Sequence, residues 1–592
     1  MPSLTVLQGA LAAALGAAVM LVVFGPGVVP PSHTGWMLSG RIGPDPVQYW
    51  LGWAFFRGDD WHWPPGLNPA YGLELSSSIF YADSIPLLAF LFKALRGVVF
   101  VDQYWGLWIL ACGALMAFMA WRLIGLATAD PVARFAGAFL FALQPMMINR
   151  LGGHLALGAQ FLILMGLWLC LRPPEPWLVR AAKWVGLSLA ASLIHSYLLP
   201  MVLAFWLADA LSRFDARRFA PEGAAVIGAA LGGLWLAGFF VLGAGHGGSG
   251  ARYGDMQLDL LAPFDPGPWG AILPDLPDPG HMETGGSYPG LGVLLLWALG
   301  IWAGWGRIAP ALRRHWPIVL VVLLMLAFAI SHQPSLGGRA IELVRMPERL
   351  LGLADALRAS ERYVWPLAYA GAIAAIWALV ARLGGRRAGF ALLGLALVQV
   401  VDFGPGQARM RHFFPPTEAR VPLRLAHPFW EEAARHYVRI RLVPAQNQGF
   451  PWEEVAVFAA THGLATDAVY LARSDEEAKA ALRARTAEEL RSGRHEAGTL
   501  YVFRDDASLA LALSGMDGRR DFVAEFDGVW VLAPGWWARG VAGPAPSPAG
   551  PDERSPVTTC RAARCPWRPP CTSDAPAPGT CPTAPPQRSL WC

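Results

Sequence analysis

Hydrophobic and polar positions divide the chain near Phe403. Before that residue, long apolar runs recur at short intervals, and apolar runs of roughly 18 or more residues indicate transmembrane helices. The first run, Leu4–Val29, has no basic leader and no small-residue cleavage site, so we interpret it as a retained span. The further predicted spans are Tyr104–Trp121, Val132–Leu143, His154–Leu171, Ala181–Leu211, Gly223–Gly243, Leu291–Trp305, Trp316–Ile330, Tyr363–Ala381 and Ala388–Phe403.

The stretch Ala181–Leu211 is predicted to be two short helices bent around His195-Ser196-Tyr197, which brings the count to about eleven or twelve spans. The run Ile85–Val101 carries Lys93 and Arg96 in its middle, and charges are costly at the centre of a bilayer. We therefore predict a juxtamembrane or re-entrant helix there.

Basic residues gather in four short connections between spans, and such connections are typically cytoplasmic. The clusters are Arg172/Arg180/Lys183, Arg213/Arg217/Arg218, Arg307/Arg313/Arg314 and Arg382/Arg386/Arg387. The same rule places outside the cell membrane residues 149–154, the loops 245–289 and 331–361, and everything after Phe403. Because the segment 85–101 is predicted not to cross the membrane, counting the spans then places the large first loop, residues 31–83, outside as well.

After Phe403 the pattern changes to that of an ordinary globular sequence. The segments "VRIRLVPA", "DAVYLAR", "TLYVF" and "FVAEFDGVWVLAP" are predicted to form strands, and "SDEEAKAALRARTAEELRSG" an amphipathic helix. Residues 404–540 are thus predicted to be a small extracytoplasmic α/β domain. The Pro- and Cys-rich tail 541–592 has few aliphatic residues and is predicted to be disordered.

Composition agrees with a mainly helical, polytopic membrane protein with transmembrane residues 1–403. The 592 residues are 54% hydrophobic and only 15% charged, which excludes an ordinary soluble enzyme. A net charge of +4 gives no reason to expect nucleic acid as a partner. Cys112 and Cys170 lie in apolar runs and are predicted to be buried, and the spacing of the five tail cysteines fits no zinc site well.

Candidate chemistry gathers in the predicted outer segments. The first loop holds Asp45, Glu74 and Asp83 among many aromatic residues, and His154 and His195 lie at helix junctions. The loop 331–361 is rich in arginine, and Arg358 and Arg362 share one face if that part is helical. Carboxylates can take a proton from a hydroxyl, arginines bind phosphate oxygens, and aromatic faces suit sugar rings.

Each of these residues also has a purely structural interpretation. Asp45 in "GPDPV" suits a turn or a helix cap, and the aromatic residues suit an interfacial belt. His154 suits a helix junction. The chemical interpretation is favoured because acids, histidines and arginines are all predicted on one side of the membrane.

Five segments carry a resemblance to a known group of proteins: "GPDPVQYWLGWAFFR", "NPAYGLELSSSIFYADSIPLLAFLFKAL", "INRLGGHLALGAQFLIL", "SLIHSYLLPMVLAF" and "LRASERYVWPLAY". Residues 1–537 resemble an uncharacterised family of bacterial polytopic membrane proteins that is similar to the GT-C glycosyltransferases. The resemblance implies a polyprenyl-phosphate-linked sugar donor, an acidic residue in the first external loop and a soluble C-terminal domain outside.

Carried onto this chain, the resemblance implies Asp45 as the catalytic acid of the first loop, with Asp83 second and Glu74 a weaker third that binds substrate. Arg358 and Arg362 would bind the donor phosphate, and His154 and His195 would contact the substrate. The pair of adjacent acids found in some GT-C enzymes is absent at Asp45, so a divalent cation stays open as a cofactor.

The sequence therefore predicts a glycosyltransferase in the bacterial inner membrane. It would move a sugar from a polyprenyl-phosphate donor to a glycan, lipid or protein acceptor of the cell envelope. The alternatives are a transporter or flippase for a lipid-linked sugar and a non-catalytic membrane scaffold.

Overall fold

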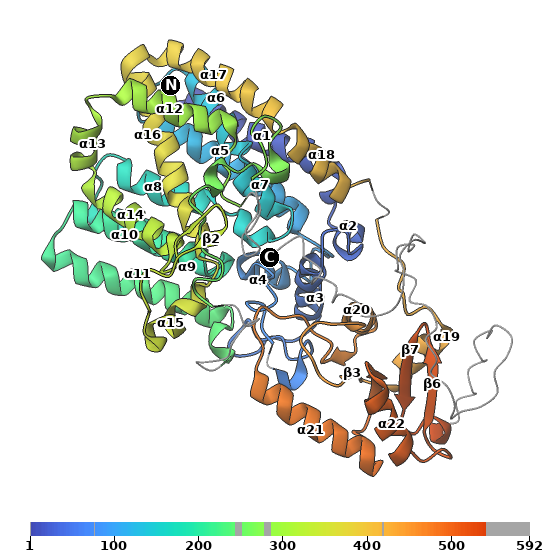
Figure 1. The fold of residues 1–592 in the computed structure, drawn as a ribbon. Coiled ribbons are helices and arrows are strands. Elements are labelled where there is room, and N and C mark those ends of the chain that lie inside the picture. The colour runs from blue at the N-terminus through green and yellow to red at the C-terminus, as the bar shows by residue number, and fades with distance from the viewer. Residues whose placement is uncertain (1, 76, 243–251, 277–285, 417–418, 540–592) are drawn as a thin grey trace, which may run out of the picture.

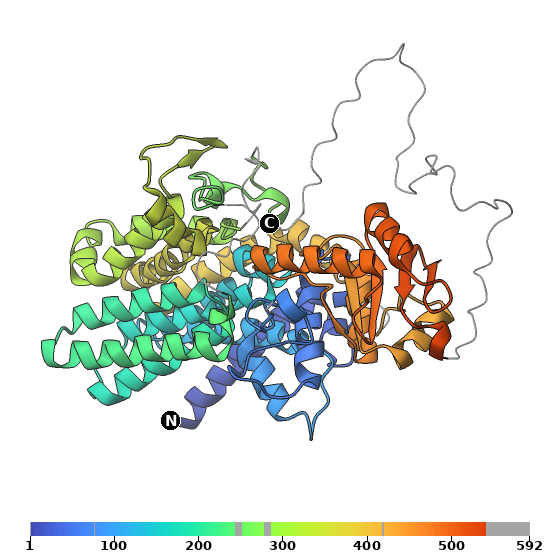
Figure 2. The same cartoon turned by 90° about the horizontal axis from the view of Figure 1, so that it is seen from below.

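The computed structural model describes residues 2–75, 77–242, 252–276, 286–416 and 419–539. A large layer of helices lies beside a smaller domain that contains a sheet (Figure 1). Seen from below, the two parts follow one another along the long direction of the molecule (Figure 2). The predicted tail, 541–592, and its cysteines lie outside the described residues.

The helical part consists mostly of apolar helices. They are α1 (Pro2–Phe24), α5 (Trp105–Ile124), α6 (Pro131–Ala142), α7 (Pro145–Leu151), α8 (Phe161–Leu171), α9 (Trp177–Ile194), α10 (Leu198–Ser212), α11 (Ala216–Leu236), α12 (Leu291–Gly304), α13 (Ile308–Arg314), α14 (Trp316–Ile330), α16 (Trp365–Leu383), α17 (Gly385–Asp402) and α18 (Gly404–Phe413). Between them lie the short α2 (Gly35–Leu38), α3 (Asp45–Gly58), α4 (Pro86–Ala94) and α15 (Glu348–Ala354), and the hairpin β1 (Ser335–Leu336) and β2 (Arg339–Ala340).

By length and composition, the described chain is a multi-pass membrane protein. Five helices are long and apolar enough to cross a membrane, or up to eight if each of three bent pairs is one span. The eleven or twelve predicted spans also count three shorter apolar helices, namely 155–171, α10 and α14. The predicted break at 195–197 is confirmed, because α9 ends at Ile194 and α10 begins at Leu198.

The segment predicted to be juxtamembrane or re-entrant forms α4, whose nine residues are too short to cross a bilayer. Its Lys93 is buried, donates to the backbone oxygen of Asp60 at 2.9 Å and lies over the rings of Phe56 and Trp61. The charge is thus held by the first loop, which is how the chain tolerates a lysine in an apolar helix.

Glycine allows close packing of α1 against α5. A Cβ atom built on Gly16 would lie 2.0 Å from the backbone oxygen of Gly113, so the two backbones touch where these glycines face each other. Small residues at a helix contact are the usual means of close approach in membranes, where the hydrophobic effect does not drive helices together.

The C-terminal domain contains α19 (Pro428–His436), β3 (Arg439–Val443), α20 (Trp452–His462), β4 (Ala465–Thr466), α21 (Glu476–Ser492), β5 (Thr499–Phe503), α22 (Asp506–Gly515), β6 (Phe522–Phe526) and β7 (Val529–Ala533). The sheet order is β4-β3-β5-β7-β6, with β3 parallel to β4 and β5 and the other neighbours antiparallel. This confirms the predicted α/β class and all of the predicted strands except one.

The exception is "DAVYLAR", residues 467–473. The strand β4 ends at Thr466, and the residues after it leave the sheet. They run instead along the first loop: Ala472 N donates to the backbone oxygen of Tyr81 at 2.9 Å, and Tyr470 N donates to the Tyr71 hydroxyl at 3.3 Å. Within its own domain the segment keeps only an isolated parallel bridge among the described residues, between Val469 and Asn447. The apolar pattern was therefore correct about burial, but the predicted strand was wrong, because the segment packs against the first loop as well as against its own domain.

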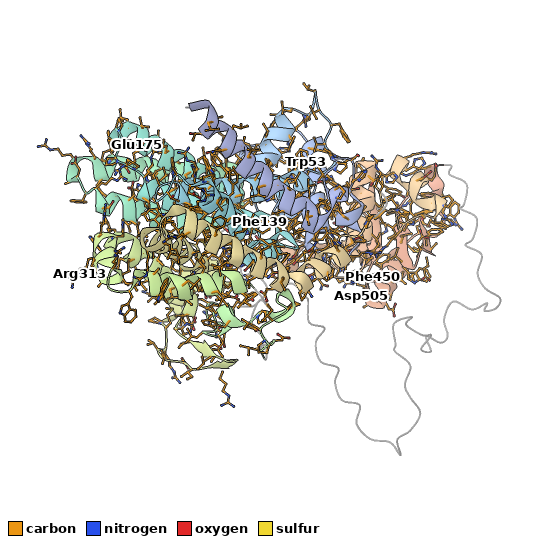
Figure 3. All side chains as sticks on the ribbon, turned by 90° about the horizontal axis from the view of Figure 1, so that it is seen from above. Trp53, Phe139, Glu175, Arg313, Phe450 and Asp505 are labelled. Carbon is orange, nitrogen blue, oxygen red and sulfur yellow. The ribbon has the colours of Figure 1, made fainter. Side chains whose placement is uncertain are left out.

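The two ends of the molecule are formed by different parts of the chain. In Figure 3, Glu175, which lies between α8 and α9, and Arg313, in the last turn of α13, are at the end farthest from Phe450 and Asp505 of the C-terminal domain. The helix α18 continues α17 after a bend of 50° and packs against α1. The helical part therefore extends to Phe413, ten residues beyond the predicted boundary at 403.

Candidate functional site

Asp45 is the first residue of α3, a helix that begins in the sequence Pro44-Asp45-Pro46. Proline suits the first turn because no backbone N–H is needed there, and a carboxylate is favoured at the positive end of the helix dipole. Asp45 is 7% exposed, and its Oδ2 lies 3.4 Å from Nδ1 of His154. One turn along α3, the Tyr49 hydroxyl lies 3.3 Å from the same nitrogen. His154 thus stands between two polar groups of one helix face.

Asp83 lies in a tight turn just before α4. Its φ of 50° is in the left-handed region, which aspartate adopts more readily than most residues. Hydrogen bonds fix this turn to α3: the Gln48 amide donates to the backbone oxygen of Tyr81 at 3.0 Å, and the Ser84 hydroxyl to that of Tyr49 at 3.2 Å. The turn therefore holds the Asp83 carboxylate in a defined place beside α3.

His195 faces Asp83 from the break between α9 and α10. Its Nδ1 accepts a hydrogen bond from the backbone N–H of Tyr197 at 3.1 Å, so the neutral ring carries its proton on Nε2. Nε2 lies 3.9 Å from Oδ1 of Asp83. Burial, and then the charges of Arg362 and His154, lower the pKa of His195 well below its ordinary value. The nitrogen that carries the proton of the neutral ring thus lies near the Asp83 carboxylate, at a distance longer than a direct hydrogen bond.

The pKa of Asp83 is raised from 3.8 to about 7, first by burial and second by the neighbouring Asp45 carboxylate. Arg362 and the Tyr49 hydroxyl act against this shift. Two carboxylates that influence each other therefore lie together, with the Asp45 side chain 9% exposed and that of Asp83 20% exposed. Such pairs are characteristic of sites that exchange protons near neutral pH.

Arg362 lies in a short 3-10 turn, 360–364, directly before α16. It is almost buried, and its guanidinium carbon lies 4.7 Å from the centre of the Tyr197 ring. The Tyr197 hydroxyl in turn accepts from the backbone N–H of Ala359 at 3.1 Å. The break between α9 and α10 thus contacts the segment that carries the arginines.

Arg358 and Arg362 were predicted to share one face if their segment is helical, and the segment is not a continuous helix. Two short 3-10 turns, 355–357 and 360–364, are separated by Arg358 and Ala359, so a period of four residues does not apply. Arg358 is half-buried, and its side chain has no hydrogen bond or ion pair among the described residues.

Glu74 does not join these contacts. Both of its carboxylate oxygens accept from Arg441 of β3, at 2.7 and 3.0 Å, and it also pairs with Arg485 of α21. Although burial acts in the opposite direction, these hydrogen bonds lower the pKa of Glu74 to about 2. Arg441 is itself buried and also contacts Asp467 and Glu496. Glu74 thus joins the first loop to the C-terminal domain.

Sequence reasoning missed two tyrosines. Burial, followed by Asp45 and Asp83, raises the pKa of Tyr49 well above its ordinary value, and Tyr470 of the C-terminal domain acts in the same direction. Tyr470 is therefore close to the acidic group although 387 residues separate it from Asp83. The position of Tyr49, one helical turn after Asp45, was a usable signal, whereas nothing local marks Tyr470.

Within the described ranges, no group of three or more His, Cys, Asp or Glu side chains is arranged to hold a metal ion. The carboxylates of Asp45 and Asp83 each face a histidine instead. The described chemistry of this site is thus acid, imidazole, phenol and guanidinium.

Comparison with known proteins gives a family and a distant structural likeness. No curated protein matches the sequence. Among solved structures, ArnT from Cupriavidus metallidurans in the apo state matches with a TM-score of 0.41 and 13% sequence identity, over 90% of this chain and 98% of that one. At that score the likeness supports no conclusion about this chain.

The sequence matches two models of one family, which together span most of the described chain. Residues 13–404 match the family described as "Domain of unknown function (DUF6311)", and residues 429–534 match the "DUF6311 C-terminal domain". The two matches separate the helical part from the sheet domain near the boundary seen in the structure. The chain therefore belongs to the DUF6311 family.

Proposed function

We propose that this protein is an integral membrane glycosyltransferase. It takes a sugar from a polyprenyl-phosphate donor and transfers it to a hydroxyl group of a cell-envelope glycan, lipid or protein. The observation that supports this most is the meeting of Asp45 and Asp83 with His154, His195 and Arg362, five ionisable side chains from four separate segments. Burying so many ionisable groups together is costly, and such clusters occur at functional sites.

The proposed step is a single displacement at the anomeric carbon of the donor sugar. The acceptor oxygen forms a bond to that carbon, and the bond from the carbon to the phosphate oxygen breaks. The proton of the acceptor hydroxyl passes to an aspartate, and the electron pair leaves with the polyprenyl phosphate. The apolar helices hold the lipid tail of the donor, so reaction takes place at the membrane surface.

Asp45 and Asp83 have different roles in this proposal. Asp45 orients the acceptor hydroxyl together with His154, and Asp83 is the second acid, whose pKa near 7 suits proton transfer at neutral pH. Arg362 and Arg358, whose side chain has no partner among the described residues, stabilise the charge that develops on the leaving phosphate. Glu74 has no role in this site, because its carboxylate forms ion pairs with Arg441 and Arg485.

The test compares glycans and lipid-linked sugars by mass spectrometry in cells that lack the protein and cells that carry a variant. Wild type is expected to restore a missing glycan, whereas Asp45→Asn leaves it missing and lets a polyprenyl-phosphate sugar accumulate. Asp60→Asn is the control, because Asp60 is an exposed acid of the same loop.

Full restoration by Asp45→Asn would remove Asp45 as a catalytic residue. A flippase would instead give a donor that accumulates on the cytoplasmic side, which a membrane-impermeant probe of the lipid-linked sugar in intact cells distinguishes. A scaffold would be indifferent to both substitutions.

A further inference from the structure

The C-terminal domain contains a hollow of about 480 Å³ that the proposed transfer step does not use. This volume is within the range of about 300–1,000 Å³ that is usual for small-molecule sites. Its lining residues are Arg424, Gln446, Asn447, Gln448, Gly449, Phe450, Trp452, Glu453 and Glu454. Most of them belong to the loop between β3 and α20 or to the first turn of α20.

The backbone of this loop is fixed by side chains behind it. The Arg504 guanidinium donates to the backbone oxygens of Gln448, Gly449 and Phe450 at 3.0, 2.8 and 3.1 Å. The Asn447 side chain donates to the backbone oxygen of Leu471 and accepts from its N–H. A loop held in this way loses little freedom when a ligand binds, which favours affinity.

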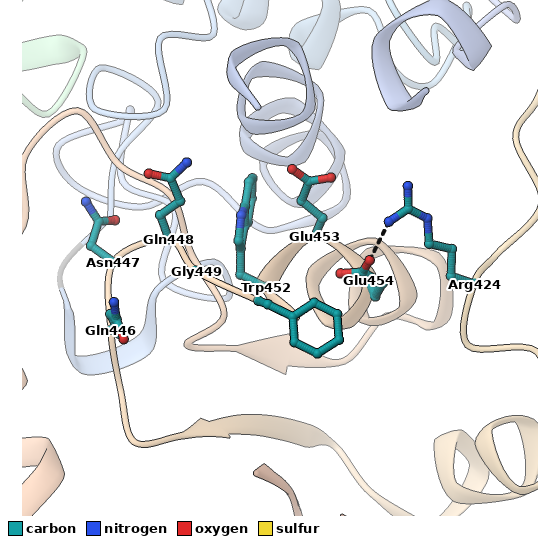
Figure 4. Close-up of a pocket in the computed structure, with 9 residues that line it drawn as sticks. Arg424, Gln446, Asn447, Gln448, Gly449, Trp452, Glu453 and Glu454 are labelled. Carbon is teal, nitrogen blue, oxygen red and sulfur yellow. Dashed lines mark hydrogen bonds and ion pairs between the residues drawn. The ribbon is translucent and has the colours of Figure 1, made fainter. Parts of the chain in front are cut away.

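The lining side chains that make no hydrogen bond within the protein are of the kinds that bind sugars. Within the described ranges, the side chains of Gln446, Gln448 and Glu453 have no hydrogen-bond partner, and the Phe450 ring is 70% exposed. In Figure 4, Gln448, Trp452 and Glu453 point to the same side of the loop. Amides both donate to and accept from hydroxyl groups, and flat rings pack on the C–H faces of sugars.

The charge of the hollow selects among saccharides. Arg424 is the one cation of the lining, and it pairs with Glu454 at 2.5 Å. The carboxylate of Glu453 is left over, so the lining favours neutral or amino sugars and disfavours phosphates and sugar acids.

We infer that this hollow binds a neutral or amino-bearing saccharide. The position of the hollow relates it to the group formed by Asp45, Asp83, His154, His195 and Arg362, here called the acidic site. The Trp452 ring packs edge-on against Tyr470 at 5.7 Å, and Tyr470 lies close to Tyr49. A second, narrower hollow shares Arg424, Glu453 and Glu454 with the first and reaches Val47 of α3, on the helix face opposite Asp45. Trp452 and Tyr470 thus connect the hollow to Tyr49 of the acidic site, and on the proposed function the bound saccharide is the acceptor glycan.

The test is saturation-transfer NMR with the full chain in lipid nanodiscs. The probes are soluble oligosaccharides of two to six hexose units in neutral, amino and uronic acid series. Neutral or amino oligosaccharides are expected to bind, and Phe450→Ala and Gln448→Ala are each expected to weaken binding about tenfold. Leu513→Ala, an exposed apolar residue on α22 of the same domain, is the control and is expected to leave binding unchanged.

Asp45→Asn separates the two proposals, because it is expected to abolish transfer and to leave saccharide binding intact. If transfer is disproved and binding persists, the hollow stands as a binding site of its own. The inference is overturned if no neutral or amino oligosaccharide binds, if the uronic acid series binds best, or if Phe450→Ala and Gln448→Ala both bind as wild type does.

Discussion

At the scale of single residues, Asp83 has the most informative surroundings. A carboxyl group with a pKa near 7 is about half ionised at neutral pH, so it can both take and release a proton without a large cost. Burial and the Asp45 carboxylate cause this shift, and His195 and Arg362 lie within reach. The same residue in an exposed loop would be fully ionised and a weaker base.

This surrounding predicts the pH dependence of transfer. Because the proposed base must be ionised, the transfer rate in isolated membranes is expected to rise through a pH of about 7 and then level off. Asp83→Asn is expected to lower the rate by roughly 10²-fold or more and to remove this rise. A rise that survives in Asp83→Asn would assign the titration to another group.

A stability measurement checks the same pKa without a substrate. The folded protein holds the proton of Asp83 more tightly than the unfolded chain does, so ionisation destabilises the fold as pH rises from about 4 to about 7. Asp83→Asn is therefore expected to unfold at a higher temperature than wild type at pH 8, and this difference should vanish below about pH 4.

At the scale of elements, the junction between the first loop and the C-terminal domain is the decisive contact. Gly72 N donates to the backbone oxygen of Thr466 at 2.8 Å, and Thr466 N donates to that of Ala70 at 2.9 Å, so the loop adds a short rung beside β4. The buried Arg441 then joins Glu74 to the sheet. The loop that ends at Asp83 is thereby positioned by a domain more than 350 residues away.

Substituting Glu74 tests this junction. Glu74→Gln removes the charge that Arg441 and Arg485 bind, so the amides of Gly72 and Thr466 are expected to exchange hydrogen several-fold faster. Hydrogen exchange with mass spectrometry measures this in detergent, with β5 and β7 as an internal reference. Glu488→Gln is the matched control, because Glu488 is exposed and, within the described part of the chain, its carboxylate pairs only with Arg491 of its own helix.

The pKa of Glu74 adds a pH dependence to the same measurement. Its pKa is lowered to about 2, so its contribution is complete above about pH 4.5 and is lost as pH falls through about 2. Unchanged exchange at Gly72 and Thr466 in Glu74→Gln would mean that the backbone contacts alone hold the junction.

At the scale of the whole molecule, the distribution of charge predicts its orientation. Arg313 and Glu175 lie at the end opposite the C-terminal domain, and connections rich in arginine are typically cytoplasmic. We therefore expect the C-terminal domain, and the acidic site with it, on the outer side of the inner membrane.

Cysteine labelling checks this orientation. In a chain whose tail cysteines are replaced by serine, a membrane-impermeant maleimide is expected to label Ser514→Cys on α22 in spheroplasts. Arg313→Cys should be labelled only after lysis. Cys112 and Cys170 lie in apolar helices, with Cys112 fully buried and Cys170 partly so, and provide the background. The reverse pattern would place the site in the cytoplasm and exclude the proposed donor side.

The sequence by itself determined the elements and the candidate acids. The apolar runs and the break at 195–197 predicted the helices correctly, because the bilayer sets the length and hydrophobicity of each membrane-spanning segment separately. The residues Asp45, Asp83, His154, His195 and Arg362 were recognisable as polar groups at helix ends. That these side chains lie close together was only an expectation, because they come from four segments: the first loop and the segments around residues 154, 195 and 362.

The tertiary structure alone decided which polar groups share a place. It brought Asp83 beside Asp45, gave Glu74 to Arg441 and added Tyr470 from the C-terminal domain. It also turned residues 467–473 from a predicted strand into a docking segment. An apolar pattern states that a segment is buried, but its partner depends on contacts between residues far apart in the chain, which no local pattern records.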